Sequence, residues 1–148
     1  MNSSQRLKPI KNLADNKEKV AAQSLGKSVE YSKNQQDRLA QLVNYRVEYI
    51  ETMSLKTQQG MSGDRLQQYH QFLSKLDTII EQQKGVVKQS VDQLSQCQNK
   101  WQSDNSRATA ITKAIKSMKS KEVKAADKKE SAQIDEMSTQ AFLRRKHT

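Results

Sequence analysis

The apolar and aromatic positions of this chain recur at intervals of three and four residues on both sides of a central break. Before the break the series runs through Leu42, Tyr45, Tyr49 and Thr52, and after it through Leu66, Tyr69, Leu73, Leu76 and Ile80. Such spacing places each series on one side of a helix. The chain is therefore expected to be helical on both sides of the break.

The break itself is the stretch GMSG at residues 60–63. Glycine weakens helices, and Ser62 is a good N-cap for the helix that follows. Asp64 then falls in the first turn, where the helix dipole favours an acidic side chain. These residues predict a bend between two helices.

Two long series carry the hydrophobic positions along these helices. The first is Leu7, Ile10, Ala14, Lys17, Ala21, Ser24, Ser28, Tyr31, Gln35, Arg38, Leu42, Tyr45 and Tyr49. The second is Leu66, Tyr69, Leu73, Leu76, Ile80, Gln83, Val87, Ser90, Leu94, Cys97, Trp101, Asp104, Ala108, Ile111, Ile115 and Met118, and it continues with weaker positions at Glu122, Ala125, Lys129 and Ala132. A series longer than about four heptads is typical of a coiled coil. The predicted fold class is all-α, a long antiparallel two-helix coiled coil, or helical hairpin.

The expected organisation is a single elongated coiled-coil domain over residues 1–148, with helices at about 6–57 and 64–145 and a bend at about 58–63. The longer second helix is expected to overhang the first from about residue 115. The middle of the first series is small or polar, and four apolar residues lie beside it: Leu13, Val20, Leu25 and Leu39. The buried stripe is therefore expected to drift around the first helix.

The composition also favours a coiled coil. Of 148 residues, 34% are hydrophobic and 5% aromatic, and the mean hydropathy is −0.96, which is too little apolar material for a globular core of this length. A long coiled coil and a disordered chain remain. One proline and four glycines argue against disorder, because disordered chains are usually enriched in both.

A formal net charge of +10 and a pI near 9.7 point to an acidic partner, which is a nucleic acid, an anionic membrane or an acidic protein surface. The densest basic run is Lys113, Lys116, Lys119, Lys121, Lys124, Lys128 and Lys129. It lacks the interleaved aromatic residues of single-strand binders. A solvated helix face is the favoured interpretation of this run, and an acidic protein partner comes next.

Catalytic and metal-binding patterns are weak. Leu25-Gly26-Lys27-Ser28 resembles the end of a phosphate-binding loop, but the glycine expected at position 21 is Ala21 and no strand precedes it. His70 and His147 have no Cys or His at metal-ligand spacing, and Cys97 has no recognisable base partner. We therefore expect neither an enzyme nor a cofactor or metal site, and we expect Trp101 to pack in the coiled-coil seam.

The compartment is predicted from absent signals. No apolar run approaches the ~20 residues that span a bilayer, and the start of the chain lacks the apolar core of a secretion signal. The single cysteine fits a reducing compartment. The protein is therefore expected in the cytoplasm.

There are more apolar residues near the bend than a single seam can bury. Tyr45 and Tyr49 follow Leu42 on one face of the first helix, while Phe72, Leu76 and Ile79 form a second stripe on the other helix. A two-helix coil has only one buried seam. Part of this surface is therefore expected to face a partner, because exposed clusters of aromatic and aliphatic side chains mark binding sites.

Several blocks of the sequence resemble FliJ-type flagellar export proteins. They are Leu7 with Leu13-Ala14, residues 21–26 (AAQSLG), residues 42–49 (LVNYRVEY), and residues 69–73 (YHQFL) followed by Leu76 and residues 80–82 (IEQ). The resemblance covers residues 7 to about 102. It rests on the combined spacing on both sides of Gly60 rather than on one motif.

The resemblance implies a hairpin similar to the stalk subunit of rotary ATP synthases. Its implied partners are the flagellar export ATPase hexamer, into which the terminal end inserts, the cytoplasmic domain of the export gate, and export chaperones. No specific nucleic acid is implied, and the membrane is met only peripherally, at the cytoplasmic face of the inner membrane at the flagellar base. The implied gate-binding residues are Leu42, Tyr45, Tyr49, Phe72 and Leu76, and the flanking Arg38 and Gln83 depart from the family pattern.

Three alternatives remain open at the level of sequence. The equivalent stalk of a virulence type III secretion system shares the same plan. A basic coiled coil that binds nucleic acid predicts tight, strongly salt-dependent binding. A structural dimeric coiled coil predicts a doubled mass in solution.

Overall fold

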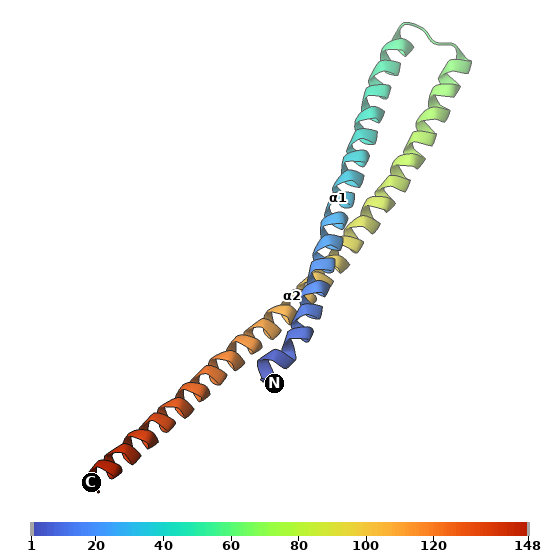
Figure 1. The fold of residues 1–148 in the computed structure, drawn as a ribbon. Helices are drawn as coiled ribbons and strands as arrows, with labels where there is room; N and C mark the ends of the chain where they lie inside the picture. Colours follow the sequence, from blue (N-terminus) through green and yellow to red (C-terminus); the bar gives the residue numbers. More distant parts are fainter. Residues whose placement is uncertain (1, 148) are drawn as a thin grey trace. The chain divides into compact units, whose positions relative to one another are not determined.

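In the computed structural model, which describes residues 2–147, the chain forms two helices (Figure 1). Helix α1 is Ser3–Gln58 and helix α2 is Gly63–Lys146, with 56 and 84 residues. The described residues contain no strand. The prediction of an all-α helical hairpin is confirmed.

Packing divides the two helices into two units, each built from a piece of α1 and a piece of α2. The terminal unit combines α1 up to Lys19 with α2 from Ser103. The bend unit runs from Val20 to Gln102 and contains the connection between the helices.

The connection follows the expected turn chemistry. At the end of α1, Gly60 donates its backbone N–H to the Thr57 carbonyl at 3.1 Å and has a φ of 102°. Side chains disfavour this left-handed region, so glycine suits the position. Ser62 then caps α2, because its Oγ accepts the backbone N–H of Arg65 at 3.3 Å. The predicted role of Ser62 as N-cap is confirmed.

In the bend unit, α2 buries the series that the sequence predicted. Leu76, Ile80, Gln83 and Ser90 are all buried, and Leu73, Val87, Leu94, Cys97 and Trp101 are half-buried. This stripe has apolar residues at most of its positions, so one orientation of α2 buries far more apolar surface than its neighbours. The prediction for this helix is therefore confirmed from Tyr69 to Trp101, whereas Leu66, where the predicted series begins, is 36% exposed.

On α1 the predicted series is wrong at every second position. The inward residues include Leu25, Ser32 and Leu39, whereas the predicted Ser24, Tyr31 and Arg38 are exposed. Counted from Ala21, the inward residues recur after four and then three positions, whereas the predicted series recurs after three and then four. At these positions α1 buries the residue that follows the predicted one, because Leu25 and Leu39 then pack in the seam in place of a serine and an arginine.

The middle of the bend unit is held by small polar side chains. Ser32 and Ser90 are 1% and 2% exposed, and Ser90 Oγ donates to Ser32 Oγ at 3.3 Å. Gln83 Nε2 donates to the carbonyl of Gln35 at 3.0 Å and to its Oε1 at 2.9 Å. Within residues 2–147, no buried side-chain polar atom lacks a partner. These hydrogen bonds offset the desolvation of a seam that is poor in apolar residues.

The terminal unit has a smaller apolar seam and a capped start. Ala14, Ala108 and Ile115 are buried. Ser4 donates its backbone N–H to Glu122 Oε1 at 3.2 Å and its hydroxyl to Glu122 Oε2 at 2.7 Å. A carboxylate at a helix N-terminus satisfies a free N–H group and complements the helix dipole. This contact explains why α1 begins at Ser3 rather than near residue 6.

Burial along α2 ends at Glu122, and every described residue beyond it is exposed. Ile115, near which the overhang was expected to begin, is 7% exposed because it lies within the terminal seam. The exposed part of α2 therefore starts about two turns later.

Candidate protein-docking surface

Four aromatic rings form one cluster across the two helices of the bend unit. Tyr49 on α1 and Phe72 on α2 have ring centroids 4.5 Å apart, and Tyr49 and Tyr69 are stacked at 5.5 Å. Tyr45 lies 6.4 Å from both Tyr49 and Phe72. We call Tyr45, Tyr49, Tyr69 and Phe72 the aromatic cluster. Such contacts add stability beyond area burial, so the rings hold one another in place.

The cluster is only partly covered by its own chain. Tyr45 is 49% exposed and Phe72 is 37% exposed, while Tyr49 and Tyr69 are half-buried. Rings that are fixed and yet exposed present a large apolar area at low entropic cost to a partner. The arrangement therefore suits docking of another protein.

The five residues expected in the docking surface do not play equal parts. Tyr45, Tyr49 and Phe72 meet through ring contacts, and Leu42 is half-buried beside them in the α1 seam. Leu76 is only 4% exposed. Its side chain therefore supports the surface from the seam instead of offering area to a partner.

An ion pair next to the cluster was missed by the sequence reasoning. Arg46 Nε donates to Asp77 Oδ1 at 2.6 Å and joins α1 to α2. This hydrogen bond raises the pKa of Arg46 above its ordinary value, and desolvation opposes the rise only in part. No local pattern signals this pair, because Arg46 and Asp77 attract each other only where the register between the two helices brings them together.

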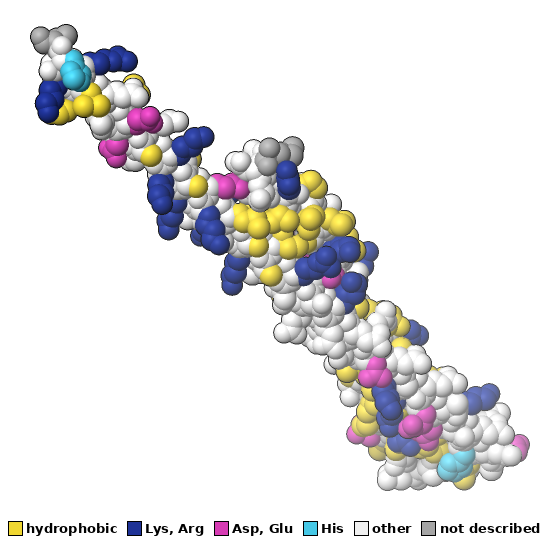
Figure 2. Space-filling view, turned by 90° about the horizontal axis from the view of Figure 1, so that it is seen from below, with side chains coloured by type: hydrophobic (Ala, Val, Ile, Leu, Met, Phe, Trp, Pro, Cys, Tyr) yellow, Lys and Arg dark blue, Asp and Glu magenta, His cyan; other side chains and the backbone are white. Residues whose placement is uncertain are grey.

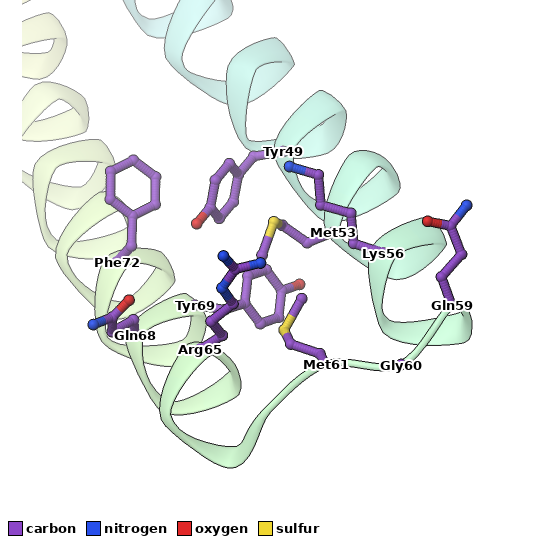
Figure 3. A pocket seen from close by; sticks show the side chains of 10 residues that line it. All are labelled: Tyr49, Met53, Lys56, Gln59, Gly60, Met61, Arg65, Gln68, Tyr69 and Phe72. Carbon is purple, nitrogen blue, oxygen red and sulfur yellow. The ribbon is translucent and has the colours of Figure 1, made fainter.

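A cavity of about 740 Å³ opens at the bend beside the aromatic cluster (Figure 3). Tyr49 and Phe72 point toward one another from the two helices, and the end of α1, the connection and the first turns of α2 complete the wall. The lining residues are Tyr49, Met53, Lys56, Gln59, Gly60, Met61, Arg65, Gln68, Tyr69 and Phe72. Two are cationic and none is acidic, so the cavity favours a group that carries negative charge.

The candidate catalytic patterns fall on ordinary helix positions. Residues 25–28, which resemble part of a phosphate-binding loop, lie within α1 and form no loop. His70 is exposed and its ring lies 5.2 Å from that of Tyr69. Within residues 2–147, no three His, Cys, Asp or Glu side chains gather in a way that would hold a metal ion.

The described part of the chain also contains no helix that combines the length and apolar character needed to cross a membrane.

The fold and this surface define the class of protein: an all-α helical hairpin with a partly exposed aromatic surface near its bend. The family model of the flagellar FliJ protein matches residues 3–147. The chain therefore belongs to the FliJ family. Membership identifies it in general terms as a flagellar export protein, and the family is a non-catalytic component of flagellar export.

Two curated relatives are consistent with this membership. The flagellar FliJ protein of Escherichia coli (strain K12) is 22% identical over 139 residues, which cover 94% of this chain and 95% of the relative. The flagellar FliJ protein of Salmonella typhi shows the same identity and coverage. No solved structure matches the chain.

Proposed function

We propose that this protein is a stalk of the flagellar export apparatus. Its terminal unit enters the hexameric ring of the export ATPase and promotes ring assembly, while the aromatic cluster docks on the cytoplasmic domain of the export gate. The protein also escorts export chaperones. It works in the cytoplasm, peripherally at the inner membrane at the flagellar base.

The observation that supports gate docking is the exposure of rings that are already packed together. Tyr45 and Phe72 contact one another edge to face and still expose 49% and 37% of their surface. Aromatic anchors of this kind supply most of the energy of protein interfaces. Family membership favours the flagellar apparatus as their setting.

Support for the stalk role comes from charge. The terminal unit contains 16 Lys and Arg side chains and 8 Asp and Glu side chains, so it holds +8 of the chain's formal net charge of +10, and the described part of the second helix beyond Glu122 is exposed along its whole length. A basic, solvent-exposed helix is attracted to acidic protein surfaces. The terminal unit is thus suited to a ring with acidic groups on its inner face.

The gate role is tested by replacing Tyr45 and Phe72 by alanine in one variant. We expect the dissociation constant for the purified cytoplasmic domain of the export gate to rise about tenfold or more, because truncated aromatic anchors typically cost more than 1 kcal/mol each. Isothermal calorimetry measures the affinity, and circular dichroism measures helicity.

The matched control is Val91→Ala, since Val91 is 44% exposed on α2 and lies outside the cluster. It should bind the gate domain like the original protein. Unchanged affinity in the Tyr45/Phe72 variant would contradict gate docking, and a large loss of helicity would show that the rings serve mainly as core.

A further inference from the structure

The terminal unit carries a second apolar surface, which the aromatic cluster does not include. Ile10 is 45% exposed and Leu13 is 58% exposed. Figure 2 shows hydrophobic side chains gathered into one band near the start of α1, with Lys and Arg side chains around it. Large apolar side chains grouped on a surface mark interaction sites more often than single ones do.

The helical register places these residues on one flank of the helix pair. The opposite flank holds two cavities, lined by Lys8, Asn12 and Asp15 of α1 together with Thr112, Lys116 and Lys119 of α2. Ile10 and Leu13 lie on the other side of the α1 seam, and Ala114 lies on the corresponding side of the α2 seam. The half-buried Leu7, Ile111 and Met118 form the base of this flank.

We call Ile10, Leu13 and Ala114, with that base, the apolar flank. Four exposed cations belong to the same side of the two helices: Arg6, Lys17, Arg107 and Lys121. None of the four forms an ion pair in the part of the chain that the structure describes. Their charges are therefore available to a partner.

We propose that the apolar flank is the surface through which the terminal unit binds the inner wall of the export ATPase ring, at an apolar patch bordered by acidic side chains. This inference rests on the proposed stalk function and adds the residues and the chemistry of the contact. The apolar centre supplies affinity through burial, and the four cations select an acidic border.

A second copy of this chain is a poorer occupant than an acidic partner. Pairing two apolar flanks would bring two borders of like charge together, which is unfavourable. The chain as a whole also carries +10, which adds repulsion between copies.

The test is stimulation of the purified export ATPase by the full-length protein and by the double variant Ile10→Gln/Leu13→Gln. Both side chains are exposed, so the variant should keep its helicity and its affinity for the gate domain. We expect the concentration for half-maximal stimulation to rise about tenfold or more. The matched control is Val29→Gln, since Val29 is 48% exposed on α1 in the bend unit.

A second variant, Lys17→Glu/Arg107→Glu, tests the charged border. It should weaken stimulation more at low salt than at high salt, because screening removes the attraction that the cations provide. Equal stimulation by both double variants and the original protein would overturn the apolar flank while leaving the stalk function in place.

Two other outcomes can be distinguished from a failure of the apolar flank alone. Failure of the original protein to stimulate the ATPase would refute the stalk function and the apolar flank with it. A doubled mass of the original protein in sedimentation, reduced to a monomer by Ile10→Gln/Leu13→Gln, would show that a second copy covers the flank and would overturn the ring contact.

Discussion

Leu76 and Ile79 lie three positions apart on α2, and the structure gives them opposite environments. Leu76 is 4% exposed in the seam, while Ile79 is 47% exposed. Both belong to the stripe that the sequence assigned to surplus apolar surface. The periodicity identified the stripe, but it could not tell which of its residues are buried and which are exposed. That difference depends on where α1 packs against α2.

The two residues should therefore respond differently to truncation. Leu76→Ala is expected to lower the free energy of unfolding by about 2 kcal/mol or more, since it leaves a cavity in the seam. Ile79→Ala is expected to change it by less than about 0.5 kcal/mol, as exposed positions usually do. Urea denaturation followed by circular dichroism measures both, and equal losses would contradict the seam described here.

Other single residues show the limit of sequence reasoning more sharply. The Ser4–Glu122 contact joins residues 118 positions apart, and the Arg46–Asp77 pair joins residues 31 apart. Such pairs follow from the register between helices and not from a local pattern. By contrast, Ser62 was predictable as a cap because its partner lies three residues away.

At the scale of the helices, α2 could be predicted and α1 only in part. The α2 series carries large apolar residues such as Leu73, Leu76 and Ile80 at successive positions, so one face is clearly preferred. On α1 the two possible inward faces differ at only a few positions. One face contains Ser24 and Arg38, and the other contains Leu25 and Leu39. The orientation is decided by packing against α2, which a single helix does not encode.

The pairing of the helices can be trapped covalently. Ser28 Oγ lies 3.2 Å from Cys97 Sγ, across 69 positions of sequence. The variant Ser28→Cys should form an intrachain disulfide on mild oxidation and stabilise the hairpin by about 4 kcal/mol or less, the chain-entropy limit for a loop of this length. Non-reducing gels detect the bond, and thermal melts with and without reductant measure its effect.

Ser24→Cys is the matched control, because Ser24 is exposed one turn away on α1. It should give no intrachain bond with Cys97. If Ser28→Cys produced only disulfide-linked dimers, the helices would be paired between chains and the hairpin would be contradicted.

For the molecule as a whole, a low apolar content is sufficient because each helix buries only one stripe. The hydrophobic residues, 34% of the chain, fill one seam in each unit. Those that remain form two exposed apolar surfaces, the aromatic cluster in the bend unit and the apolar flank in the terminal unit. The first was expected from the sequence. The second was overlooked, because Ile10 had been assigned to the seam and Leu13 to its edge, whereas both are exposed.

The most direct test of the stalk function measures the activity and assembly of the purified flagellar export ATPase with and without this protein, with DNA binding at moderate salt as a control. We expect faster ATP hydrolysis together with hexameric rings visible by electron microscopy, and only weak DNA binding that disappears with salt. Unchanged hydrolysis and no rings, combined with tight DNA binding of steep salt dependence, would contradict the stalk and indicate a basic coiled coil that binds nucleic acid.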